Sequence, residues 1–301
     1  MIAEFLSIPG SYDWTVIEPV AKGWSSDRKY YVETCTGEKL MVRIASAGDY
    51  EQKKTEFELL CQLEQMAFHL PKPLDIGICL GEQSIYTVYT WLDGEEATDK
   101  LTRFSPVQQY RLGNRAGHIL KCIHSLPVSE SQQKDWGRYF RHKIMRKVEK
   151  YHQCPVKFQE AETIIDFINQ HLDLLDTRPV TFQHGDFHVG NMVIDQKGNL
   201  GIIDFNRHDI GDPWEEFNRI TWSAHISPAF ATGQIDGYFD GKIPEHFFTL
   251  QALYIGANMI SSIPWAIEFG DGEVETMKQQ IQLVCDAYKG FSAIKPLWYQ
   301  K

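Results

Sequence analysis

The chain has 301 residues, of which 43% are hydrophobic, enough for about two domains with cores of their own. Its 30 Lys and Arg against 40 Asp and Glu give a net charge of −10, which argues against nucleic acid or anionic membrane as a partner. The six cysteines form no C-x-x-C pair, and the sequence has no signal peptide or long apolar run, so we expect a cytoplasmic protein with reduced thiols.

The first ninety residues predict a small sheet-rich unit. Alternating apolar residues predict strands over 29–34, 39–45 and 84–92, and a helix is expected over 49–66 with Asp49 as its N-cap. A further strand and turn precede residue 29, with Gly23, Ser25 and Ser26 at the bend. The three strands and the helix together indicate a mixed α and β unit.

The character of the chain changes after "LDGEEA" at 92–97. Apolar residues at helical spacing predict helices over 105–126, 137–151 and 161–175. The last hundred residues also suggest helices, broken by prolines (Pro213, Pro244, Pro264). We therefore predict an α+β protein with a sheet-rich lobe at 1–93 and a larger, mostly helical lobe at 94–301.

The stretch "HGDFHVGNMVIDQKGNLGIIDF", residues 184–205, combines polar groups with two apolar strands. "MVID" and "LGII" are joined by "QKGN", where Gly198 suits a tight turn. If Asp195 pairs with Leu200, the register places Asn191 opposite Asp204. An amide oxygen beside a carboxylate suits Mg²⁺, so this pair is a candidate metal site.

Asp186 lies five residues before Asn191, on the loop that enters the hairpin. The pattern H-x-D-x-x-x-x-N, followed by a strand and I-D-F, matches the catalytic part of the kinase template for phosphoryl transfer. The form "HGDFHVGN…IIDF", with Gly185 in place of the arginine of protein kinases, resembles the aminoglycoside phosphotransferase family of small-molecule kinases.

This resemblance implies a two-lobed, protein-kinase-like fold that uses ATP and Mg²⁺ to phosphorylate a hydroxyl group of a small molecule. Asp186 would orient the acceptor hydroxyl, and Asn191 with Asp204 would hold Mg²⁺. His188 would lie near the γ-phosphate, although a structural role for it is an equal alternative. Glu216 would replace the aspartate that braces the catalytic loop in the family.

The first lobe supplies the groups that a kinase needs to hold a nucleotide. In "KLMVRIA", Arg43 shares one strand face with Lys39, opposite the apolar face, and Glu56 shares the apolar stripe of the helix. A carboxylate on a buried face needs a partner, and Arg43 is the expected one. Arginine replaces the lysine of the template, and Lys39 remains the alternative contact to the phosphates.

Other nucleotide contacts follow from the resemblance alone. Ser25 and Ser26 would lie in the loop over the phosphates. The backbone groups of Thr90 and Leu92 would meet the adenine edge, with Tyr89 behind it.

The expected acceptor is an aminoglycoside or a similar cationic amino sugar, with a role in antibiotic resistance. Acidic candidates for binding it are five carboxylates of the C-terminal lobe: Asp209, Asp212, Glu215, Glu268 and Asp271. A choline-like amine or a sugar of primary metabolism is the alternative acceptor. We expect a monomer or a weak dimer.

Two alternatives belong to other classes of protein. The first is a metal-dependent hydrolase with a His/Asp site built from His184, Asp186, His188 and Asp204. It leaves Asn191 unexplained. The second is a catalytically silent module that binds nucleotide without turnover.

Overall fold

The computed structural model describes residues 5–21, 26–66, 68–81 and 83–300. The chain divides into two compact units, Met1–Glu95 with Met192–Asn206, and Glu96–Asn191 with Arg207–Lys301. The hairpin at 192–206, which the sequence placed in the larger lobe, therefore groups with the first unit. The sheet-rich first part and the helical remainder have the predicted α+β character.

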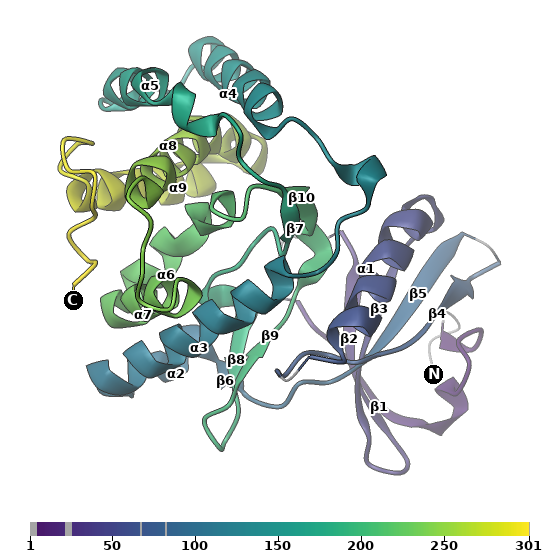
Figure 1. Cartoon of the computed structure of the whole chain (residues 1–301). Coiled ribbons are helices and arrows are strands. Elements are labelled where there is room, and N and C mark those ends of the chain that lie inside the picture. The colour runs from purple at the N-terminus through teal and green to yellow at the C-terminus, as the bar shows by residue number, and fades with distance from the viewer. Residues whose placement is uncertain (1–4, 22–25, 67, 82, 301) are drawn as a thin grey trace. The chain divides into compact units, whose positions relative to one another are not determined.

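The first unit contains a five-stranded antiparallel sheet with strand order β1-β2-β3-β5-β4. Helix α1 (Tyr50–Leu63) packs against β4 and β5 of this sheet (Figure 1). It begins after Asp49, as predicted. The strands are β1 (Trp14–Pro19), β2 (Arg28–Thr34), β3 (Lys39–Ser46), β4 (Pro73–Cys79) and β5 (Ser84–Thr90). The sequence did not predict β4, an edge strand whose side chains are mostly only partly buried.

The two faces of β3 differ as its alternation predicts. Leu40, Val42 and Ile44 are buried in a core together with Phe5 and Trp14. Because neighbouring residues of a strand point to opposite faces, Arg43 lies on the other face, where it contacts α1. The strand thus separates an apolar core from a buried ion pair.

The hairpin consists of β8 (Met192–Ile194) and β9 (Leu200–Ile202), with Gly198 at φ 81° in the turn. The predicted register is wrong by one residue. Ile194 pairs with Leu200 and Met192 pairs with Ile202, so the ladder ends before Asn191 and Asp204. Extended outward, this register would place Ile203, not Asp204, opposite Asn191.

The second unit is mostly helical, and α3 packs against α7 (Figure 1). Helix α3 opens with a capping box between Ser105 and Gln108, and Pro264 lies within α8 rather than ending it. The helices are α2 (Ala97–Leu101), α3 (Pro106–His124), α4 (Trp136–Gln153), α5 (Ala161–Gln170), α6 (Ile220–Ile226), α7 (Pro228–Tyr238), α8 (Phe247–Ala266) and α9 (Asp271–Ala287). The short strand β6 (Glu95–Glu96) precedes α2, and β7 (Thr181–Gln183) pairs with β10 (Asp209–Gly211).

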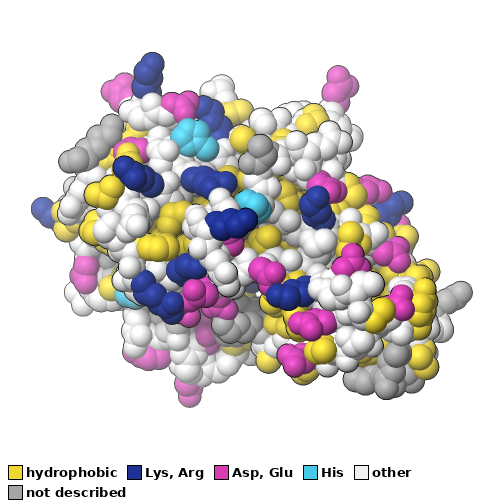
Figure 2. Space-filling view, turned by 90° about the horizontal axis from the view of Figure 1, so that it is seen from below, with side chains coloured by type: hydrophobic (Ala, Val, Ile, Leu, Met, Phe, Trp, Pro, Cys, Tyr) yellow, Lys and Arg dark blue, Asp and Glu magenta, His cyan; other side chains and the backbone are white. Residues whose placement is uncertain are grey.

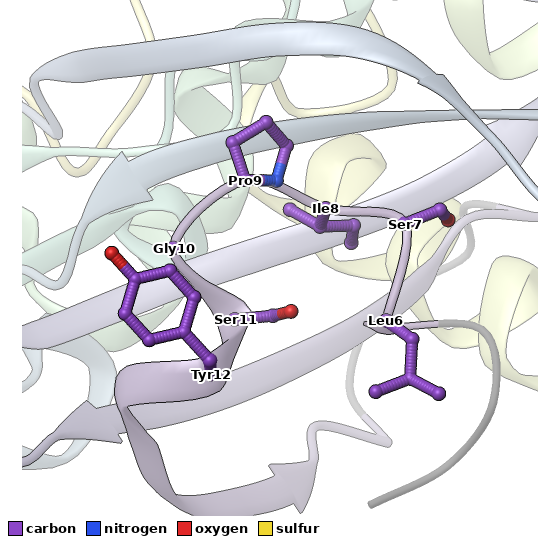
Figure 3. A pocket seen from close by; sticks show the side chains of 7 residues that line it. All are labelled: Leu6, Ser7, Ile8, Pro9, Gly10, Ser11 and Tyr12. Carbon is purple, nitrogen blue, oxygen red and sulfur yellow. The ribbon is translucent and has the colours of Figure 1, made fainter.

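No helix within the described ranges is long and apolar enough to cross a membrane. On the face shown in Figure 2, basic and acidic side chains are interspersed rather than gathered by sign. Figure 3 shows a small hollow formed by the single segment Leu6–Tyr12. Its lining residues carry no charge and include no predicted site residue.

Candidate active site

The loop that carries Asp186 begins directly after β7. Gly185 has φ 84°, and a Cβ atom at this position would lie 1.9 Å from the carbonyl oxygen of Arg207. Any larger side chain would therefore clash with backbone, in a conformation that L-residues rarely adopt. This explains why glycine stands here, where protein kinases have arginine.

Asp186 lies among three side chains of the second unit. The Asn191 amide nitrogen donates to the Asp186 carbonyl oxygen at 2.9 Å and to its Oδ2 at 3.2 Å. Asp186 Oδ1 is 3.5 Å from His188 Nε2 and 3.3 Å from Arg219 Nε. The predicted pair of Asp186 and Asn191 is thus in direct contact, and His188 contacts Asp186 itself.

These neighbours keep Asp186 ionised. Burial works to raise the pKa of Asp186, but the hydrogen bond to His188 and the positive charge of Arg219 outweigh it. The pKa therefore lies below the ordinary value for aspartate. The ionised form of the Asp186 carboxylate is therefore favoured, and in that form it can accept a hydrogen bond from a hydroxyl group.

Glu216 holds the backbone of the same loop, as expected from the sequence. Its carboxylate is buried and accepts hydrogen bonds from the Gly185 N–H at 3.0 Å and from the Phe187 N–H at 3.4 Å. His124 Nε2 lies 3.7 Å from Glu216 Oε2. Burial opposes ionisation of Glu216, yet His124 and the loop N–H groups lower its pKa below the usual value.

Replacing Glu216 with alanine is expected to lower the free energy of unfolding by about 2–4 kcal/mol, because buried N–H groups lose their acceptor. Glu216→Gln keeps an acceptor oxygen and is expected to cost less. The pKa of Glu216 is lowered in the folded state, so its negative charge stabilises the folded protein above pH 4.5. This stabilisation is lost as the pH falls through the folded-state pKa. Urea unfolding at pH 7 and pH 4 measures both effects; an unchanged midpoint in Glu216→Ala would contradict the bracing role.

Arg43 occupies the centre of a charged cluster in the first unit. Its Nη1 is 3.1 Å from Glu56 Oε1, its Nη2 is 3.0 Å from Asp204 Oδ1, and its Nε is 3.6 Å from Asp27 Oδ2. Lys53 adds ion pairs to Asp27 at 2.5 Å and to Glu56 at 3.7 Å. The predicted pair of Arg43 and Glu56 is present, within a larger network that the sequence did not predict.

Lys39, the alternative phosphate contact, is engaged elsewhere. Its Nζ lies 2.9 Å from Asp93 Oδ1, and both side chains are largely exposed. Ser26 is exposed, whereas Ser25 lies outside the described residues.

A hydrogen bond of Thr90, at the end of β5, limits the adenine contact predicted for this residue. The N–H of Thr90 already donates to the Lys72 carbonyl oxygen at 2.9 Å. An adenine contact from Thr90 would therefore use its carbonyl oxygen. The predicted contact from Leu92 stays a prediction.

The side chains expected to hold Mg²⁺, those of Asn191 and Asp204, offer oxygen atoms of the kind that this ion binds. Because the Asn191 nitrogen is held by Asp186, its Oδ1 is the atom left for a cation. Asp204 follows β9 at φ 67°, a left-handed conformation that aspartate tolerates better than most residues. Carboxylate and amide oxygens are ligands that Mg²⁺ prefers, so these residues fit the ion.

The alternative of a metal-dependent hydrolase requires His184, Asp186, His188 and Asp204 to hold a metal ion together. Across the ranges that the structure describes, no three His, Cys, Asp or Glu side chains are grouped so as to hold a metal ion. His184 is fully buried, and its Nδ1 accepts a hydrogen bond from the Asp186 N–H at 3.3 Å. It shapes the loop.

Two of the five acidic candidates for binding the acceptor are internal ion-pair partners. Asp212 is buried and accepts two hydrogen bonds from Arg178 at 2.6 and 2.8 Å. Glu215 is mostly buried and lies 3.8 Å from Lys143. Both carboxylates are therefore already paired, and Asp212 also accepts a hydrogen bond from the buried Tyr254 at 2.6 Å.

The sequence reasoning missed Asp27, Lys53, His124 and Arg219. Lys53 could have been found, because it stands one helical turn before Glu56. Arg219 follows Glu216 by one turn, but nothing in that spacing points to Asp186. His124 is 92 residues from Glu216, and only the fold brings them together.

A family model described as "Phosphotransferase enzyme family" matches residues 16–249. A curated relative, an aminoglycoside 3'-phosphotransferase from Niallia circulans, is 26% identical over 238 residues, 71% of this chain and 80% of that protein.

Solved structures share the fold at low identity. Amicoumacin kinase hAmiN, in complex with AMP-PNP, Ca²⁺ and Ami, has a TM-score of 0.67 and 15% identity, covering 93% of this chain and 90% of that one. The gentamicin complex of APH(2")-IIa has a TM-score of 0.63 and 15% identity, covering 89% and 91%. Together with the family match over most of its length, these findings show that the chain belongs to the phosphotransferase enzyme family, whose members transfer phosphoryl groups to hydroxyls.

Proposed function

We propose that the protein transfers the γ-phosphoryl group of ATP, with Mg²⁺, to a hydroxyl group of a small molecule. The observation that carries the proposal is the Asp186 side chain, hydrogen-bonded to Asn191 on a loop that Glu216 holds in place. Asp186 would orient the acceptor hydroxyl and receive its proton. The acceptor oxygen bonds to the γ-phosphorus while the bond to the β–γ bridging oxygen breaks, and ADP leaves.

The residues around this step would act mainly by positioning and by neutralising charge. Asn191, through Oδ1, and Asp204, through its carboxylate, would hold Mg²⁺, which supplies positive charge to the phosphates. Arg43 and Glu56 would form the ion pair of the nucleotide-binding lobe, as their distance of 3.1 Å supports. The proposed nucleotide contacts also include Ser25, Ser26, Thr90 and Leu92. For His188, the distance to Asp186 supports a role as its partner rather than a contact to the γ-phosphate.

For the acceptor, an aminoglycoside or a similar cationic amino sugar is the first candidate, since the curated relative is an aminoglycoside 3'-phosphotransferase. Such an acceptor would connect the protein with antibiotic resistance. A neutral sugar of primary metabolism is the second candidate, because Arg219 lies 3.3 Å from Asp186 and would repel a cation there. We also propose a cytoplasmic protein that works as a monomer or weak dimer without nucleic acid.

A screen of ATP consumption tests the proposal. Purified protein, ATP and Mg²⁺ are combined with aminoglycosides, macrolides, choline-like amines and neutral sugars, and GTP replaces ATP in a parallel series. We expect turnover with at least one acceptor, and loss of that turnover when EDTA removes Mg²⁺. Turnover of an acceptor without any nucleotide, together with tightly bound Zn²⁺ in the purified protein, would instead support a hydrolase.

A catalytically silent module makes a different prediction. It would bind ATP with Mg²⁺ but consume none with any acceptor of the panel. Mass spectrometry of the acceptor, gaining one phosphoryl group, distinguishes transfer from simple ATP hydrolysis. If amino sugars are inert and neutral sugars are phosphorylated, the aminoglycoside assignment is wrong while the phosphotransferase assignment stands.

A further inference from the structure

Helix α4 is strongly basic, although the whole chain has a net charge of −10. Between Trp136 and Gln153 it contains a single acidic residue, Glu149. Its six lysines and arginines are Arg138, Arg141, Lys143, Arg146, Lys147 and Lys150. Of these, Arg141 is paired with Asp176 at 2.7 Å, and Lys143 and Lys147 are partly buried. Part of the positive charge of α4 is therefore directed into the second unit rather than into solvent.

Lys143 and Lys147 lie one helical turn apart, on the side of α4 that meets α8 and the short helix Glu215–Arg219. Lys143 Nζ is 3.8 Å from Glu215 Oε1, and Lys147 Nζ donates to the carbonyl oxygen of Ala257 in α8 at 3.2 Å. Within the ranges that the structure describes, the Lys147 ammonium has no second acceptor. Two of its three N–H donors are thus left for a ligand.

Arg219 continues the positive charge to the catalytic loop. Its Nε lies 3.3 Å from Asp186 Oδ1, and 25% of its side chain is exposed. Among the described residues, the two Nη atoms of Arg219 have no hydrogen-bond partner. Their N–H groups are therefore available beside the carboxylate that would orient the acceptor hydroxyl.

The three cations influence one another, and they outnumber the carboxylates beside them. Burial and the charges of Lys143 and Arg219 lower the pKa of Lys147 to about 7, although Glu215 acts to raise it. Asp186 and Glu215 are the carboxylates that contact the three cations, which leaves one net positive charge. The Mg²⁺ ion proposed for this enzyme would add to that excess rather than remove it.

The other charged groups around the cluster do not offset this excess. Glu216 holds the N–H groups of the catalytic loop, and Asp212 is paired with Arg178. Arg207 adds further positive charge around Asp186. An anionic group is the ligand that such a cluster stabilises, and beside Lys147 it would favour the charged ammonium.

We propose that Lys143, Lys147 and Arg219 bind an acidic group of the acceptor, so that the substrate class is a small hydroxyl compound with a carboxylate or a phosphate. This inference rests on the proposed phosphotransferase function. The amino-sugar acceptor belongs to a relative that is 26% identical, and the charge of an acceptor is set by the side chains that meet it. A polycationic amino sugar would be repelled by the three cations.

The first test uses acceptors that differ in charge but little in shape. One set is glucose, glucuronate, glucose 6-phosphate and glucosamine, and the other is glycerol, glycerate, glycerol 3-phosphate and serinol. These join the ATP-consumption screen, and the comparison of carboxylate with phosphate separates the two acidic groups. The acidic acceptors are expected to have kcat/KM values at least about tenfold above those of their neutral counterparts, and the amines the lowest values. If the best acceptor of the whole screen is neutral or cationic, the assignment is wrong.

The second test substitutes the lysine nearest to α8. Lys147→Met is expected to raise the KM for an acidic acceptor about 10- to 100-fold, the effect of losing one charged hydrogen bond. The KM for the neutral counterpart and the affinity for Mg·ATP should stay within about twofold. Lys147→Arg keeps the charge and should recover part of the preference. Arg138→Met is the matched control, because this exposed residue lies about two and a half turns from Lys147, on the opposite side of α4.

Two outcomes in Lys147→Met would contradict the role of this residue. An equal loss with acidic and neutral acceptors would mean that Lys147 acts through the packing of α4 on α8. A loss of affinity for Mg·ATP, with the acceptor KM unchanged, would mean that the cations serve the nucleotide phosphates instead. If the wild-type protein phosphorylates no acceptor of either set or of the wider screen, the proposed function fails first, and the acidic acceptor falls with it.

Discussion

Replacing Asp186 with alanine is expected to lower kcat by about 10²- to 10⁴-fold, the usual contribution of a positioned catalytic base. Affinity for Mg·ATP should change little, because the variant removes the group that meets the acceptor. Asp186 contacts Asn191, His188 and Arg219, so the alanine variant must first be shown to unfold at a similar temperature. Steady-state kinetics with an acceptor found in the screen, beside direct titration of nucleotide, measures both quantities.

The matched control is Asp166→Ala, which removes an exposed carboxylate from α5 and should retain full activity. Asp186→Asn keeps the shape of the side chain and loses its charge, so it separates charge from packing. Activity of Asp186→Ala within tenfold of the wild type would show that the loop does not carry the catalytic base.

The lowered pKa of Asp186 also predicts a pH dependence. Its neighbours keep the carboxylate ionised well below pH 5, so it gains no further charge as the pH rises toward neutrality. An acidic limb in the pH profile of kcat/KM near pH 6 would therefore belong to another group.

Replacing Arg43 with methionine is expected to have the largest effect on stability. The variant removes the guanidinium that contacts Glu56, Asp27 and Asp204, and the loss of one partner from a buried charge cluster costs about 3–5 kcal/mol. For a chain of this size we expect a fall in Tm of roughly 10 °C. Differential scanning calorimetry measures it directly.

Two further variants sharpen this prediction. Arg43→Lys keeps the charge but cannot contact three carboxylates at once, so an intermediate Tm is expected. Lys39→Met removes an exposed ion pair from the same face of β3, and exposed pairs contribute little. If Arg43→Met and Lys39→Met have equal Tm values, the cluster is not a source of stability.

The catalytic motif and the faces of β3 could be predicted because they depend on local spacing. The interval from Asp186 to Asn191 leaves the two side chains in contact, as the structure records. The apolar residues Leu40, Val42 and Ile44 alternate along β3 with a period of two, although Arg43 and Ala45 on the opposite face are buried as well. Arg43 and Glu56 followed from the same reasoning, since a carboxylate on a buried helix face requires a partner.

The register of β8 and β9 could not be predicted in this way. Met192 and Ile194 of β8 and all three residues of β9 are buried, so these short strands lack the clear polar alternation that would distinguish one register from the next. The conformation of the turn between Ile194 and Leu200 sets the register of the two strands. Asp195 accepts hydrogen bonds from the N–H groups of Lys197 and Asn199, so it shapes the turn.

The sequence by itself determined the reaction class, through the spacing of Asp186, Asn191 and the I-D-F, and it determined the ion pair of Arg43 with Glu56. Only the tertiary structure decided which charges surround those groups. Asp27 joins Arg43, and Arg219 joins Asp186, through contacts between different elements of the fold. The reason is physical: a period of two or 3.6 residues shows which face of an element is buried, but the partners of a buried charge depend on how the elements pack.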